Sequence, residues 1–78
     1  MTLEDLKPGQ NARIESVDPS APEVVRLMVL GMTEGAVICF HNAAIGGDPL
    51  EISIFGSSVS LRRKQARYFQ ISPIPDHV

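Results

Sequence analysis

Residues 50–61, LEISIFGSSVSL, decide the fold class. Within positions 50–55, Leu50, Ile52 and Ile54 alternate with Glu51 and Ser53, which is the pattern of a β-strand with one buried face. Gly56 and Ser57 form a predicted turn, and positions 58–62 alternate again as another short strand. Short alternating segments separated by turn residues are typical of a small β-barrel or sandwich.

Short segments separated by glycine and proline residues continue on both sides of this stretch. Positions 36–44 form a strongly β-like run with apolar residues on both faces, so we expect a central strand that pairs antiparallel with 50–55. Near the N-terminus, a Thr-x-x-Asp spacing predicts one helical turn with Leu3 and Leu6 folded inward. The predicted order is a helical turn at 2–5, a strand at 10–17, a helix at 22–30, strands at 36–44, 50–55 and 58–62, a helical turn at 62–66 and a strand at 68–71. This order predicts a mainly β fold: an SH3-like small barrel of about five short antiparallel strands with one helix and one or two helical turns.

The predicted helix over 22–30 carries more apolar surface than it can bury. Pro22 suits the first helical position, and Gly31 suits the position after the last turn because it adopts positive φ without a Cβ clash. Only Glu23 and Arg26 carry charge in this segment. A helix that is apolar almost all round cannot bury every face in so small a domain.

The surplus apolar side of this helix is the first candidate functional site. If Leu27 and Leu30 face the barrel, then Val25, Met28 and Val29 lie largely on other sides. A contiguous exposed apolar patch usually marks a partner-binding site, and methionine suits adaptable contacts. The alternative, in which long loops cover the helix, stays open because periodicity cannot decide for a helix that is apolar all round.

Length, charge and cysteine content exclude several classes of protein. Seventy-eight residues make one small domain, which we place at 1–74 with a short tail at 75–78. Seven basic and nine acidic residues give a net charge of −2, which argues against nucleic acid as the partner. One cysteine excludes an internal disulfide, and no apolar run has the length of a membrane span. We therefore expect a cytoplasmic domain without direct membrane insertion.

Residues that carry chemistry are scarce. Cys39 and His41 share one face of a predicted strand, but no third group orients them for catalysis. Asp48 or Glu51 is a further candidate metal ligand beside them, but no metal-binding motif is present. The segment 46–48 is glycine-rich, but a strand follows it where a phosphate loop needs a helix, so we interpret it as a turn. We expect no enzyme activity, no catalytic residues, no bound metal and no cofactor.

A basic segment near the C-terminus is the second candidate site. It contains four of the seven basic residues: Arg62, Arg63, Lys64 and Arg67. The segment suits an acidic surface or partner, whereas the plainer interpretation is a solvated turn balanced by nearby acids.

Four stretches together resemble the FeoA family, the small cytosolic proteins that accompany the ferrous iron transporter FeoB. They are Leu3-x-x-Leu6-x-x-Gly9, Arg26-Leu27-x-x-Leu30-Gly31-Met32-x-x-Gly35, Gly47-Asp48-Pro49-Leu50-Glu51-Ile52, and Gly56-x-x-Val59-x-Leu61-Arg62-x-x-x-Ala66. In order, they cover residues 3 to about 72. The chain departs from the family's pattern at Ala44 and at Thr33-Glu34, where family members often have a proline, and both departures concern loops.

The resemblance implies an SH3-like barrel and a non-enzymatic accessory role in ferrous iron uptake, through contact with a FeoB-type membrane GTPase. The partner-binding residues that we expect are Val25, Arg26, Met28, Val29, Met32, Arg62 and Arg63. Self-association into a homo-oligomer is compatible with this role. The alternative is a metal-responsive regulatory domain, because FeoA-like barrels also occur at the C-terminus of metal-dependent transcriptional repressors.

Overall fold

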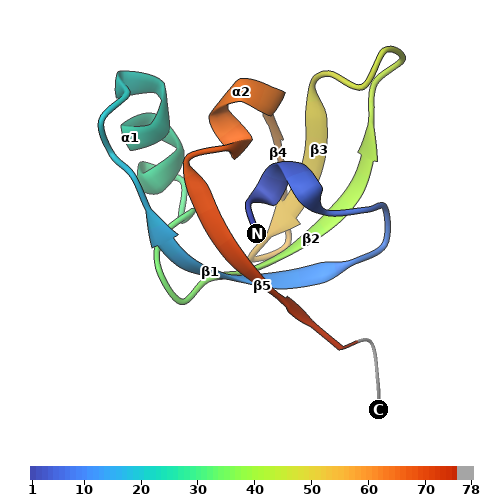
Figure 1. Cartoon of the computed structure of the whole chain (residues 1–78), viewed down its shortest axis with the longest axis horizontal. Coiled ribbons are helices and arrows are strands. Elements are labelled where there is room, and N and C mark those ends of the chain that lie inside the picture. The colour runs from blue at the N-terminus through green and yellow to red at the C-terminus, as the bar shows by residue number, and fades with distance from the viewer. Residues whose placement is uncertain (76–78) are drawn as a thin grey trace.

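The computed structural model describes residues 1–75 and shows one curved antiparallel sheet with helices at its open side (Figure 1). The strands are β1 (Asn11–Val17), β2 (Val37–Ala43), β3 (Leu50–Ile54), β4 (Ser57–Leu61) and β5 (Phe69–Ile74). The helical elements are the 3-10 turn η1 (Leu3–Asp5), α1 (Pro22–Val29) between β1 and β2, and α2 (Arg63–Ala66) between β4 and β5. The predicted fold class is confirmed. Of the predicted tail at 75–78, residues 76–78 lie outside the described part.

The strands are ordered β4-β3-β2-β1-β5 across the sheet, so β2 is the central strand, as its two apolar faces predicted. The strand pairing shifts register twice. One shift lies between Ile14 and Ser16 in β1, and the other lies between Phe40 and Asn42 in β2. Such bulges bend a strand and increase its twist, which allows this short sheet to curl into a barrel.

The core lies inside the curved sheet, where buried side chains of the helical elements pack against those of the strands. Every strand contributes to it, as do η1, α1 and the segment after α1. Its largest fully buried side chains are Phe69, Leu3, Ile14, Met32, Ile38, Leu50, Ile52, Leu61 and Val24. Leu3 and Leu6 are both buried, as predicted for the N-terminal turn. No polar or charged residue among residues 1–75 is buried, so the side chains that fill the interior are all apolar.

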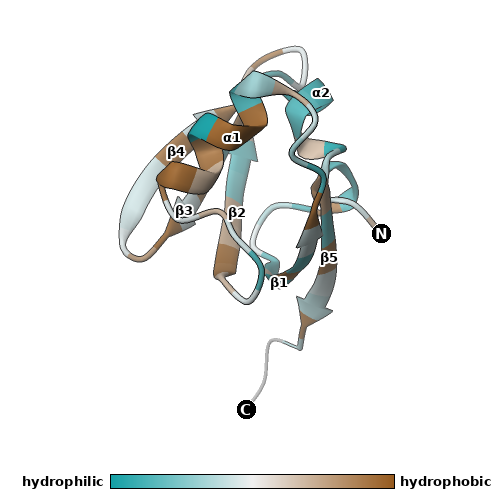
Figure 2. Cartoon of the chain, turned by 90° about the vertical axis from the view of Figure 1, so that its left-hand side faces the viewer, coloured by the Kyte–Doolittle hydropathy of each residue, from teal (hydrophilic) through white to brown (hydrophobic). Residues whose placement is uncertain are grey.

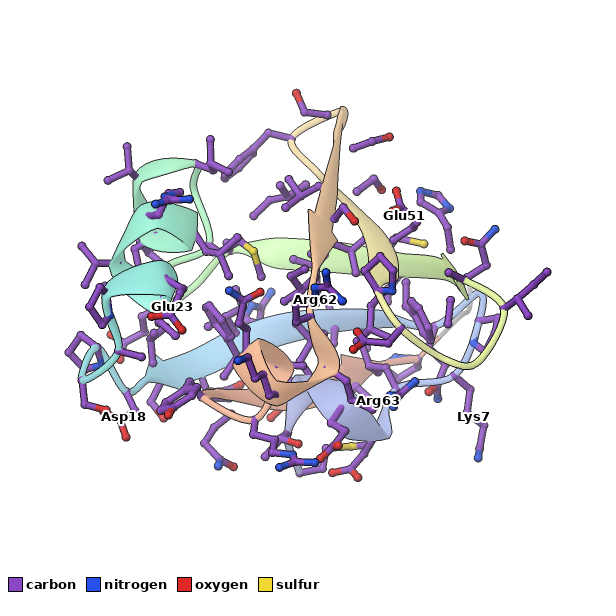
Figure 3. The ribbon with its side chains drawn as sticks, turned by 90° about the horizontal axis from the view of Figure 1, so that it is seen from above. Lys7, Asp18, Glu23, Glu51, Arg62 and Arg63 are labelled. Atoms are coloured by element: carbon purple, nitrogen blue, oxygen red, sulfur yellow. The ribbon has the colours of Figure 1, made fainter. Side chains whose placement is uncertain are left out.

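The helix α1 lies along the free edge of β4. At one end of α1, Gly31 lies against Phe55 in the turn that leads into β4. At the other end, Glu23 lines a groove together with Arg62, which directly follows β4. Figure 3 shows this arrangement from above, with α1 standing beside β4.

The final strand is longer than predicted. It continues to Ile74 instead of ending at Ile71, and Pro73 lies opposite Ala12 of β1. Proline is tolerated there because β5 is an edge strand. The other predicted bounds lie within one residue of the observed ones. None of the helices within residues 1–75 is long and apolar enough to cross a lipid bilayer.

Candidate partner-binding surface

Four large apolar side chains are exposed where α1 meets the turn between β3 and β4. Their exposed fractions are 45% for Val25, 81% for Val29, 55% for Leu30 and 77% for Phe55. Figure 2 views the molecule from the side of α1, where much of this helix has the brown colour of hydrophobic residues. We call these four residues the apolar surface.

The spacing of the buried residues in α1 explains which of its residues are exposed. Val24 and Leu27 are three positions apart and both face the core. Val25 and Val29 therefore fall on the outer side, as predicted. Met28 lies between the two sides and is only partly buried.

Leu30 and Met32 occupy places that differ from those predicted. Gly31 adopts a φ of 112°, and its N–H donates to the Met28 carbonyl at 3.0 Å. The Met32 N–H donates to the Leu27 carbonyl at 3.2 Å, which completes a Schellman motif. This turn directs Met32 into the core, where it is fully buried, and leaves Leu30 exposed. The expectation that Met32 contacts a partner is therefore corrected, and Leu30 takes its place on the surface.

Phe55 joins the apolar surface through Gly31. Phe55 and Gly56 form the turn between β3 and β4, one position earlier than predicted. A Cβ atom placed on Gly31 would lie 3.0 Å from the Cε2 atom of the Phe55 ring, so the ring packs directly over this glycine. Because Gly31 follows Leu30 in the chain, the ring continues the surface formed by α1.

The basic segment contains one arginine that the fold itself uses. The Arg63 guanidinium donates to the Gly47 carbonyl from Nη2 at 2.8 Å and to the Glu4 carbonyl from Nη1 at 3.3 Å. Arg63 therefore helps to hold the fold together, and its contact with a partner stays a prediction. The other three basic residues are exposed: Arg62, Lys64 and Arg67.

A groove of about 700 Å³ separates α1 from α2. Its lining residues are Glu23, Asp48, Arg62, Arg63, Lys64, Gln65 and Arg67. Figure 3 shows Glu23 on the α1 side and Arg62 at the end of β4. The Asp48 carboxylate accepts a hydrogen bond from the Arg63 backbone N–H at 2.8 Å and lies 4.0 Å from the Arg62 guanidinium. Because both signs of charge line the groove, it is a poor match for a simple anion.

Cys39 and His41, the candidate catalytic or metal-binding pair, belong neither to the apolar surface nor to the lining of the groove. Cys39 is partly buried and His41 is exposed on β2. Within residues 1–75, no group of three His, Cys, Asp or Glu side chains is placed to hold a metal ion.

The chain is similar in sequence and structure to a known family of proteins. The family model of the FeoA domain matches residues 1–73. The chain belongs to the FeoA family. The solution structure of the FeoA protein from Chlorobium tepidum is similar, with 31% sequence identity and a TM-score of 0.89 over 100% of this chain and 74% of that protein. Comparison with curated proteins finds no match.

Two further solved structures are similar to this chain, one from the same family and one that shares only the fold. FeoA from Stenotrophomonas maltophilia in complex with zinc is 26% identical, with a TM-score of 0.79 over 92% of this chain and 89% of that one. It is described as a prokaryotic SH3 domain protein and a candidate activating factor of bacterial ferrous iron transport, which supports the SH3-like assignment. A manganese-dependent transcriptional repressor is 13% identical, with a TM-score of 0.83 over 95% of this chain and 36% of its own, and shares the fold alone.

The stretch from Arg26 to Gly35, which resembles the FeoA family, contains both buried and exposed residues. Leu27 and Met32 are buried, and Gly31 has the positive φ that the turn requires. Arg26 and Leu30 belong to the same segment but are exposed, so packing in the monomer does not explain them. The segment therefore serves the fold on one side and the apolar surface on the other.

Proposed function

We propose that this chain is a non-enzymatic, cytoplasmic accessory protein of ferrous iron uptake, which acts by binding a cytosolic part of a FeoB-type transporter. The observation that carries this proposal is the apolar surface on a domain that already has a closed core. Membership of the FeoA family supplies the link to ferrous iron transport.

The physical argument rests on the free energy available from burial. Removing a Val, Leu or Phe side chain from water contributes about 1.5–3 kcal/mol when burial is complete. The four exposed side chains are neighbours, because Val25 and Val29 are one helical turn apart and the Phe55 ring packs on Gly31 beside Leu30. Large exposed apolar patches usually mark an interaction site. Arg26 is exposed one helical turn before Leu30, so a cation borders the surface. Apolar centres with an arginine are typical of protein interfaces.

A charge placed in the apolar surface tests the proposal. Val29 is 81% exposed, so Val29→Glu leaves the fold intact but requires a carboxylate to be buried on binding. We expect a loss of affinity of at least about tenfold for the cytosolic domains of the FeoB-type transporter from the same organism, measured by titration calorimetry. Thermal unfolding followed by circular dichroism checks that the variant is folded.

Ile45 offers a matched control. It is fully exposed in the loop between β2 and β3, on the opposite side of Figure 1 from α1. Ile45→Glu makes the same change of charge outside the apolar surface and should bind like the wild type. Equal losses in both variants, or no binding by the wild-type chain, would contradict the proposal. Sedimentation of the chain alone separates transporter binding from self-association through the same surface.

A further inference from the structure

Phe55 occupies a backbone position that suits few side chains. It forms a two-residue turn with Gly56, and the two residues have φ values of 51° and 81°. Turns with positive φ at both positions favour Asn, Asp or Gly at the first, because a Cβ atom crowds the backbone in this conformation. Among residues 1–75, Phe55 is the only residue other than glycine with positive φ. The turn therefore does not account for a phenylalanine here.

The core does not account for it either. The chain has three phenylalanines, of which Phe40 and Phe69 are buried and Phe55 is mostly exposed. An aromatic ring in water is unfavourable, and the left-handed backbone adds strain at the same residue. Two unfavourable features at one position indicate a role outside the folding of the monomer.

The ring also has a contact within the monomer. Its Cε2 and Cδ2 atoms lie 3.0 and 3.1 Å from where a Cβ atom of residue 31 would be, so any larger residue at this position would push the ring aside. One edge of the ring packs on Gly31 while the rest faces solvent. An aromatic side chain has only two rotatable bonds and loses little conformational freedom on binding, and such residues commonly fill a pocket at the centre of an interface.

We infer that Phe55 is the anchor of the partner contact. Its ring inserts into an apolar pocket on the cytosolic part of the transporter, and Val29 and Leu30 pack around that pocket's rim. The charge of Arg26 at the border of the apolar surface calls for a carboxylate beside the pocket. This inference rests on the proposed function, because it names the chemistry of the partner's side of the same contact.

Two substitutions at residue 55 test the inference. Phe55→Asn removes the ring but suits the positive φ of the turn, and Phe55→Tyr keeps the ring. We expect Phe55→Asn to raise the Kd for the cytosolic domains of the FeoB-type transporter by about 30-fold or more without lowering Tm. We expect Phe55→Tyr to stay within about threefold of the wild type.

The outcomes separate this inference from the proposed function. If Phe55→Asn binds like the wild type while Val29→Glu does not, Phe55 is not the anchor and the proposed function stands. If Phe55→Asn loses binding and its Tm falls by more than about 5 °C, the ring serves the fold and the inference is overturned. If the wild-type chain itself does not bind, the proposed function fails.

Discussion

Replacing Arg63 by methionine tests whether this part of the basic segment serves the fold. The guanidinium reaches the Gly47 carbonyl from Nε and Nη2 at 3.1 and 2.8 Å, and the Glu4 carbonyl from Nη1 at 3.3 Å. These bonds tie α2 to residues 16 and 59 positions earlier in the chain. Methionine keeps the unbranched apolar stem and the helix propensity of the position but donates no hydrogen bond.

The size of the effect follows from these contacts. A hydrogen bond from a charged donor contributes about 1.5–3 kcal/mol. Both carbonyl groups belong to partly buried residues, so water replaces part of what is lost, and we expect Arg63→Met to lower the free energy of unfolding by about 2 kcal/mol. For a domain of this size, that corresponds to a fall in Tm of about 8–16 °C.

The neighbouring residue provides the control. The Arg62 side chain is 65% exposed, and its guanidinium lies 4.0 Å from Asp48, so Arg62→Met should change stability by less than about 0.5 kcal/mol. Urea unfolding followed by circular dichroism measures both variants. An Arg63→Met protein as stable as the wild type, or an equal loss in Arg62→Met, would refute the reasoning.

Two further predictions concern stability. Gly31→Ala should lower the free energy of unfolding by about 2 kcal/mol, because φ is 112° at this residue and the new Cβ atom would press on the Phe55 ring. Urea unfolding measures this change, and an unchanged unfolding midpoint would contradict the described packing. Arg67→Ala should lower the free energy of unfolding by less than about 1 kcal/mol, because the Arg67 side chain, whose Nε lies 3.1 Å from the Glu4 carboxylate, is 64% exposed. A larger loss that persists in high salt would show that this pair is more than a surface contact.

Most of the fold could be predicted because its signals are local. Alternation along 50–55 and the apolar faces of 36–44 gave the strands, and the position of β2 at the centre of the sheet followed from the same pattern. The proline and the glycine that bound α1 gave the helix to within one residue. Each of these features depends on neighbours only a few positions apart.

The role of Arg63 could not be predicted in this way. Arg62 and Arg63 are adjacent, and nothing in the sequence distinguishes them. The structure does, because the carbonyl groups of Glu4 and Gly47 both reach only one of them. Contacts between residues far apart in the chain depend on how the sheet closes, and no local pattern encodes them.

The unusual position of Phe55 could have been predicted from the sequence. Leu50, Ile52 and Ile54 share the buried face of β3, so alternation alone places Phe55 on the outer face with the polar residues. An aromatic residue on that face, directly before a glycine, already departs from the local pattern.

The apolar surplus of α1 is a second departure, and only the structure shows that the two meet at Gly31. Local rules tend to be broken at functional sites. Two independent departures that meet at one surface therefore support the proposed partner contact more specifically than either the helix or the family resemblance does.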